Sequence, residues 1–75
     1  MMMYSVQILV NHKDYGQYKG VKFELNEEKL EEIKKSVSSN ISKGSFEFTS
    51  EDGSFIIFPS KIINESIIEI DIEEI

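Results

Sequence analysis

Residues 46–58 place the strongest constraint on the fold, because two β-prone runs flank the pair Asp52-Gly53. Such a pair accepts the positive φ angles that a two-residue type I′ turn requires. The stretch also holds four of the five phenylalanines of the chain. It therefore predicts a β-hairpin that supplies much of the apolar core.

The returning run of this hairpin, residues 55–58, is apolar at every position. A two-residue turn would pair Phe48 with Ile57 on the core face and leave Ile56 and Phe58 on the other face. A strand that is apolar on both faces is either covered on both sides or presents one face to a partner. We therefore expect Ile56 and Phe58 to contact another molecule.

Hydrophobic periodicity predicts the other elements of the chain. Alternation of apolar and polar residues indicates strands, and a spacing of three to four indicates a helix. The predicted elements are strands at 4–11, 19–25 and 67–72, a helix at 26–40, and a connector at 60–66 that includes one helical turn.

The predicted helix has clear start signals. Asn26 is a favourable N-cap, and Glu27 and Glu28 follow in the first turn, where the helix dipole favours anions. Its apolar residues form one narrow stripe, which can be buried against a sheet. The stripe consists of Leu30, Ile33, Val37 and Ile41.

These elements predict a single α+β domain over residues 1–75, in the order ββαβββ. A mostly antiparallel, twisted sheet of four or five strands would carry the helix on one face. The expected core residues are Val6, Ile8, Val10, Val21, Phe23, Leu30, Ile33, Val37, Phe46, Phe48, Phe55, Ile57, Ile68 and Ile70. Because one helix cannot cover both sheet faces, we expect a homodimer or a higher homo-oligomer.

Composition excludes several kinds of site. The chain has no cysteine and one histidine, which excludes disulfides, cysteine-based metal sites and histidine-rich metal sites. We expect neither a metal nor a cofactor. The sequence has no signal-peptide pattern and no apolar run of membrane-spanning length, so we expect a soluble cytoplasmic protein.

The net charge of −6 lies entirely in the last third of the chain, since residues 1–50 hold seven lysines and seven acids. An acidic surface disfavours nucleic acid and anionic lipid and favours a basic partner. In the last strand Glu69, Asp71 and Glu73 alternate with isoleucines and would share one face. Glu47 and Glu51 would join them if the predicted hairpin neighbours that strand.

This acidic face has two interpretations. It is either a docking surface for a basic protein partner, together with Glu47, Ile56 and Phe58, or a solvated sheet face. Charged residues on an edge strand also discourage edge-to-edge aggregation. Carboxylates on alternate positions of a strand lie about 7 Å apart, but no third group converges on them to suggest catalysis or metal binding.

The loop at 12–19 supports an alternative, because it mixes aromatic and basic side chains that can stack on a base and contact phosphate. The candidate ligand-binding residues are Lys13, Tyr15, Tyr18 and Lys19. The competing interpretation is an ordinary polar hairpin loop, since no nucleic-acid-binding signature accompanies it. His12 stands near Asp14, but no nucleophile motif completes an acid–base site.

Taken together, these patterns predict a small acidic, non-catalytic binding or accessory protein. The size, charge and composition suit an inhibitor from a phage or another mobile element that docks on a basic partner. The alternatives are an oligomeric protein that binds a nucleotide-like anion through the 12–19 loop, and a structural subunit of a larger assembly. We do not expect an enzyme, nor direct binding to nucleic acid or membrane.

Overall fold

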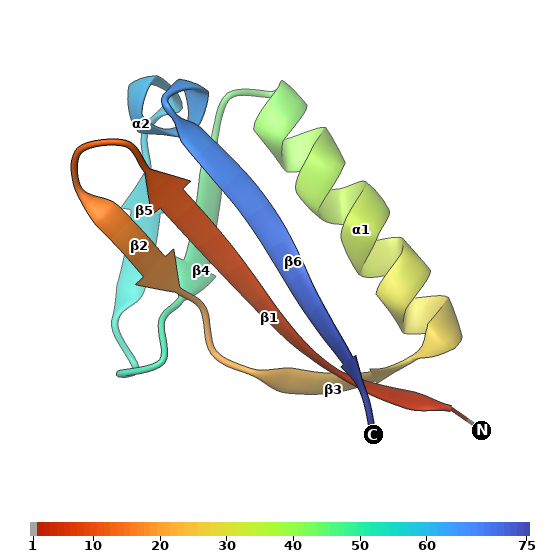
Figure 1. Cartoon of the computed structure of the whole chain (residues 1–75). Helices are drawn as coiled ribbons and strands as arrows, with labels where there is room; N and C mark the ends of the chain where they lie inside the picture. Colours follow the sequence, from red (N-terminus) through yellow and green to blue (C-terminus); the bar gives the residue numbers. More distant parts are fainter. Residues whose placement is uncertain (1) are drawn as a thin grey trace.

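The computed structural model describes residues 2–75 and shows a small α+β domain with mostly antiparallel strands and one main helix (Figure 1). The elements in chain order are β1 (Met3–His12), β2 (Gly16–Lys19), β3 (Phe23–Asn26), α1 (Glu27–Ser42), β4 (Phe46–Thr49), β5 (Phe55–Phe58), α2 (Ser60–Asn64) and β6 (Ser66–Glu74). The predicted fold class is confirmed. The order differs from the prediction in two places: β2 forms mostly within the predicted loop at 12–19, which leaves only β3 in the predicted strand at 19–25, and the connector contains the short helix α2.

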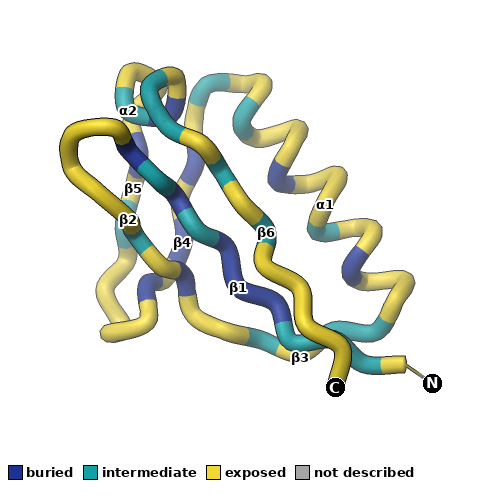
Figure 2. The backbone as a smooth tube through the Cα atoms, viewed as in Figure 1, coloured by how far each residue is buried: buried dark blue, intermediate teal, exposed yellow. Residues whose placement is uncertain are grey.

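Strand β1 is the centre of the larger sheet, because neighbouring strands pair with both of its sides. β6 runs antiparallel along one side, from Tyr4 opposite Glu74 to His12 opposite Ser66. β2 and β3 share the other side, where they pair with residues 9–12 and 3–6 of β1. Figure 2 shows that the middle of β1 is buried, whereas much of β6 is exposed.

The predicted strand at 19–25 is wrong in its continuity, because the chain leaves β1 between β2 and β3. Gly20 marks the break: its N–H donates to the Ile8 carbonyl at 2.8 Å, and it forms a β-bridge with Ser50. A Cβ at Gly20 would lie 3.1 Å from the Ile8 oxygen and 3.2 Å from the Phe48 ring. This close approach joins the β4–β5 hairpin to the sheet. It also leaves Val21, an expected core residue, exposed.

Helix α1 begins as predicted and ends two residues later than the predicted boundary. The Asn26 side chain accepts a hydrogen bond from the Lys29 N–H at 2.8 Å, which caps the helix. Leu30 and Val37 are buried, and Ile33 and Ile41 are half-buried along the same stripe. The stripe packs against the larger sheet and β4, as expected for a helix with one apolar face.

The loop of the β4–β5 hairpin is longer than the predicted two-residue turn. It spans residues 50–54, and only Gly53 has a positive φ, of 91°. Asp52 keeps a negative φ and instead accepts hydrogen bonds from the Ser50 hydroxyl and, at 2.9 Å, from the Ser54 N–H. Side-chain hydrogen bonds of this kind compete with the tight turn that Asp-Gly otherwise favours.

The longer loop shifts the strand pairing by one residue, so the predicted register is wrong. Phe46 pairs with Phe58. The side chains of β5 that face inward are therefore Ile56 and Phe58 instead of the expected Phe55 and Ile57. Phe58 is only 3% exposed and Ile56 is half-buried, whereas Phe55 is 61% and Ile57 is 65% exposed. The expected core positions Phe55 and Ile57 therefore lie on the surface. Phe58 takes a central place in the core.

The core lies between one face of the larger sheet and a layer formed by α1, α2 and the separate two-stranded sheet β4–β5. The expected single sheet is therefore replaced by two sheets that pack together. The helical turn predicted in the connector is α2, and its residue Ile63 is buried. The buried cluster consists of Ile8, Val10, Val37, Phe46, Phe48, Phe58 and Ile63.

Candidate functional site

The uncovered face of the larger sheet carries the predicted acidic row. The register places Glu69 opposite Leu9, Asp71 opposite Gln7 and Glu73 opposite Ser5. Because side chains alternate along a strand, these acids lie on the face opposite the buried core residues of β1. All three are exposed. The structure thus confirms that they share one face, on the long strand β6 at the front of Figure 1.

Strand order adds a carboxylate that the sequence did not indicate. Glu24 of β3 pairs with Ser5 from the side opposite Glu73, so both acids flank Ser5 on the same sheet face. Two strand spacings separate their backbones by about 10 Å. We define the acidic face as Glu24, Glu69, Asp71 and Glu73. Recognising Glu24 required knowledge that β3 and β6 lie on either side of β1.

Polar side chains support this face across three strands. Asn11 of β1 donates from Nδ2 to the Glu69 Oε1 at 2.8 Å and to the Ile67 carbonyl at 3.2 Å. Gln17 of β2 donates to the Asn11 Oδ1 at 2.7 Å. The buried Gln7 donates to the Gly20 carbonyl at 3.0 Å. The face is therefore a hydrogen-bonded polar surface that holds Glu69 in place.

Within residues 2–75, the ion pairs of the structure do not involve the acidic face; they involve Glu31, Glu32 and Glu65. The pairing register places Lys19 on the same sheet face, opposite Leu9. Lys19 and Glu69 flank Leu9 from its two sides, while the other carboxylates extend toward the far end of β6. The face thus has a negative stretch from Glu69 to Glu73.

The structure does not bring the other proposed contact residues to this face. Glu47 and Glu51 belong to β4 and to the loop after it, and β4 pairs with β5 in the separate sheet rather than with β6. Phe58 is buried in the core and Ile56 is half-buried beside it. Their expected exposure depended on the wrong hairpin register, so they do not extend the acidic face.

His12 is a buried structural residue at the end of β1 rather than a partner of the Asp14 carboxylate. Its Nδ1 accepts the backbone N–H groups of Asp14 and Tyr15, each at 3.0 Å. The ring proton therefore lies on Nε2, which donates to the Glu65 carboxylate at 3.0 Å. This hydrogen bond lowers the pKa of Glu65, with a smaller contribution from the charge of Lys13. Both ring nitrogens are used for holding the turn.

The residues of the 12–19 loop are divided among separate places. Tyr15 stacks on His12, and Tyr18 packs edge-on against Phe58. Both tyrosines line a hollow of about 190 Å³ beside β5 whose other lining residues are apolar. Lys13 instead pairs with Glu65. Lys19 shares a wider surface depression of about 680 Å³ with Tyr18, and Glu51 and Asp52 line it as well. The two lysines and two tyrosines therefore do not form one anion site.

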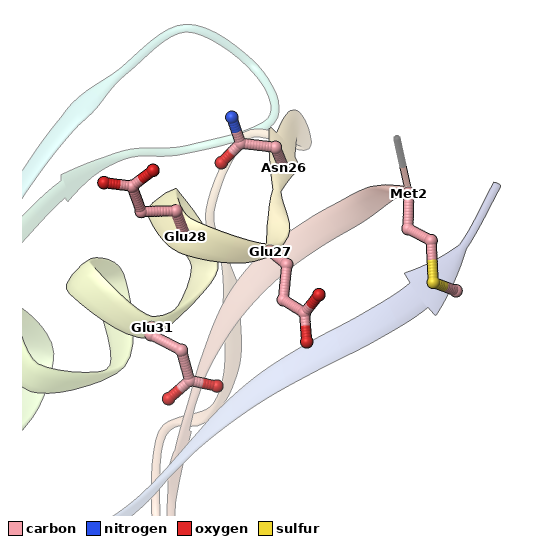
Figure 3. A pocket seen from close by; sticks show the side chains of 5 residues that line it. All are labelled: Met2, Asn26, Glu27, Glu28 and Glu31. Atoms are coloured by element: carbon pink, nitrogen blue, oxygen red, sulfur yellow. The ribbon is translucent and has the colours of Figure 1, made fainter.

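Another surface hollow, of about 480 Å³, lies beside the start of α1 and is lined by Met2, Asn26, Glu27, Glu28 and Glu31 (Figure 3). Its carboxylates point in different directions, and Glu28 points away from Met2. Among residues 2–75, no group of three or more histidine, cysteine or acidic residues is arranged to hold a metal ion. The hollow thus has no convergent ligand set.

The part of the chain that the structure describes contains no helix that is long and apolar enough to cross a membrane. Comparison with known proteins adds no identity to these observations. No family model matches the chain, and neither characterised proteins nor solved structures show a significant similarity to it.

Proposed function

We propose that this chain is a small non-catalytic binding protein that docks its acidic face on a basic surface of another protein. The observation that carries the proposal is the exposed row of Glu69, Asp71 and Glu73 on an uncovered sheet face, extended by Glu24 across β1. An accessory or inhibitor protein of this kind acts by occupying a basic site and needs no catalytic group.

The electrostatics of the face favour this partner. Neighbouring carboxylates on β6 lie about 7 Å apart, so they repel one another in the free protein. Lysine or arginine side chains of a partner would relieve that repulsion and form charge-assisted hydrogen bonds. Complementary charge also accelerates association at low ionic strength. We therefore expect binding to weaken as salt concentration rises.

The state of the titratable groups also supports a binding role over catalysis. His12, the histidine of the chain, uses both ring nitrogens in structural hydrogen bonds. The carboxylates of the acidic face are exposed, whereas catalytic acids and bases usually lie in a cleft with positioned partners. The hollow beside β5 is lined by two tyrosines and apolar residues, without a carboxylate or a histidine.

The binding test compares two triple variants with the same net charge. Glu69→Gln, Asp71→Asn and Glu73→Gln neutralise the acidic face. Glu31→Gln, Glu32→Gln and Glu47→Gln neutralise exposed carboxylates elsewhere. Both triple variants change the net charge from −6 to −3. A partner captured from the native host by the wild-type chain should bind the first variant about tenfold more weakly or worse and the second almost unchanged.

Equal binding of the wild-type chain and the acidic-face variant would contradict the proposal. Equal weakening by both triple variants would also contradict it, because total charge rather than this face would then control binding.

The small-ligand alternative, a nucleotide-like anion, has weaker support. The two tyrosines of the 12–19 loop do share a hollow, but its volume of about 190 Å³ is below the roughly 300–1,000 Å³ of typical ligand sites. No lysine lines it, so a phosphate group would lack a cation there. The wider depression of about 680 Å³ does join Tyr18 and Lys19, but Glu51 and Asp52 also line it and disfavour an anion. A thermal-shift screen with nucleotides tests this alternative, since a native-state ligand raises the melting temperature with concentration.

A further inference from the structure

Strand β5 is an apolar sheet edge without the usual protection. Among residues 2–75 it pairs only with β4, in a two-stranded sheet, so its other edge has no strand neighbour within the described chain. No charged residue occurs from Gly53 to Ser60, although 29% of the chain is charged. Natural proteins usually protect such edges with charges, as β6 does here, because an exposed apolar edge pairs with other chains. Pro59, directly after the strand, is the one protective residue.

The hydrogen bonds show which backbone groups face that edge. The Ser50 N–H donates toward β5, to the Ser54 carbonyl, whereas the Thr49 carbonyl accepts from Val21 on the opposite side. Thr49 therefore directs its backbone groups away from β5, and its pairing partner Phe55 directs its own away from β4. The alternation repeats two residues later at Ile57. Phe55 and Ile57 thus present their N–H and C=O groups at the free edge.

The same two residues also present exposed side chains. Phe55 and Ile57 lie on the outer face of β5, at 61% and 65% exposure. Both the hydrogen-bonding groups and the apolar groups of this edge are therefore free to meet one partner strand. A strand that satisfies both must be extended, apolar and able to donate and accept at alternate residues.

We propose that β5 of a second copy of this chain is that strand, so that two hairpins form one continuous antiparallel sheet, β4–β5–β5–β4. In this register Phe55 of each copy pairs with Ile57 of the other, and each such pair exchanges two hydrogen bonds. The two Ile56 residues lie opposite each other on the two-fold axis. This arrangement uses the edge-facing groups of both residues in both copies.

Charge and symmetry favour a second copy over a different protein. In a two-fold dimer each contact occurs twice. If Phe55 of the first copy pairs with Ile57 of the second, then Ile57 of the first copy also pairs with Phe55 of the second, so one strand sequence supplies both sides of the contact. The net charge of −6 makes two copies repel, and this repulsion is weakest where charge is absent, as it is in β5. A basic partner would have nothing to pair with there. The acidic face lies on the other sheet and stays free, so the inference is independent of the proposed function.

The hollow beside β5 gives the contact a second component. Tyr15, Tyr18, Pro59 and Ile62 line it on the side of the half-buried Ile56. A second β5 at the edge brings its own Ile56 next to this hollow, where an isoleucine side chain would cover apolar surface. The strand has four residues, so we expect a contact smaller than the roughly 800 Å² per partner of a standard interface. We therefore expect a reversible dimer rather than an obligate one.

The test is the mass of the full chain in solution over a range of about 1 µM to 1 mM, a span that covers weak to moderate dimers. We expect the measured mass of the wild-type chain to rise from that of a monomer to that of a dimer across this range. Ile57→Lys should remain monomeric across the range, because it places a charge at the edge. Ile67→Lys is the matched control, since Ile67 is a similarly exposed isoleucine on β6, an edge strand of the larger sheet. It should dimerise like the wild type.

A wild-type chain that stays monomeric to the highest concentration would overturn the proposal. So would a dimer that persists in Ile57→Lys or disappears only in Ile67→Lys. The chain contains no cysteine, so single-cysteine variants test the register directly. Ile56→Cys should form a disulfide-linked dimer on mild oxidation, because residues opposite each other on the axis have the required spacing. Crosslinking of Ile67→Cys at the same rate would contradict that register.

Discussion

The hairpin register makes the sharpest stability prediction, because Phe55 and Phe58 lie in the same four-residue strand but in opposite environments. Phe58 is 3% exposed and contacts the rings of Phe46, Phe48 and Tyr18, at centroid distances of 6.2, 5.1 and 5.6 Å. Replacing a buried phenylalanine with alanine costs about 3–5 kcal/mol. Phe55 is largely exposed, and Phe55→Ala should cost about 1 kcal/mol or less.

The expected loss is large relative to the whole protein. At typical values a domain of 75 residues has a free energy of unfolding of about 4–11 kcal/mol. Phe58→Ala should therefore lower the melting temperature by about 12 °C or more, or leave the chain unfolded. Phe58→Leu keeps part of the apolar volume and should lose about 1–2 kcal/mol, which keeps the comparison measurable.

The assay is urea unfolding followed by circular dichroism, at low micromolar concentration so that β5 edges are unpaired. We expect the free energy of unfolding to decrease in the order wild type, Phe55→Ala, Phe58→Leu and Phe58→Ala. A Phe55→Ala variant that loses as much stability as Phe58→Ala would refute the observed register and would instead support the two-residue turn.

Three further changes test other parts of the fold. Gly20→Ala would place a Cβ 3.2 Å from the Phe48 ring and should cost about 1–3 kcal/mol in urea unfolding; a neutral result would show that this approach is not tight. Asn26→Ala removes the cap of α1 and should cost about 1 kcal/mol, whereas Asn26→Ser should retain most of it; equal losses would argue against the cap. The hydrogen bond from Ser50 is the main cause that lowers the pKa of Asp52 to about 2 in the folded chain. The ionised carboxylate therefore stabilises the fold above its unfolded pKa, near 4, and this stabilisation is lost as the pH falls toward 2. Between pH 5 and pH 2 the melting temperature should fall less for Asp52→Asn than for the wild type. An identical pH dependence of the two melting temperatures would contradict this expectation.

Helix α1 and the acidic row could be predicted because their signals are local. The cap at Asn26 and the apolar stripe lie within the helix itself, and the alternation that groups Glu69 with Asp71 lies within one strand. Such patterns depend on backbone periodicity alone. The expected side-chain grouping therefore survives although the strand order was unknown.

The errors arise where local preferences compete or where distant segments decide. Asp52-Gly53 is compatible with a two-residue turn, but hydrogen bonds to the Asp52 carboxylate favour a longer loop. The longer loop shifts the strand register by one residue, and this shift exchanges the inward and outward faces of β5. Glu24 joins the acidic face only because β3 and β6 flank β1. His12 depends on Glu65, which lies 53 positions away in the sequence. No local pattern contains such pairings.

The central functional claim is that the acidic face contacts a partner. Hydrogen–deuterium exchange of the chain, with and without the captured partner, tests it most directly by reporting which backbone amides become protected. The account predicts new protection along β6, residues 66–74, and in β3 beside Glu24, with α1 and β5 unchanged. Protection confined to α1 or to β5, with β6 exchanging as in the free chain, would contradict it.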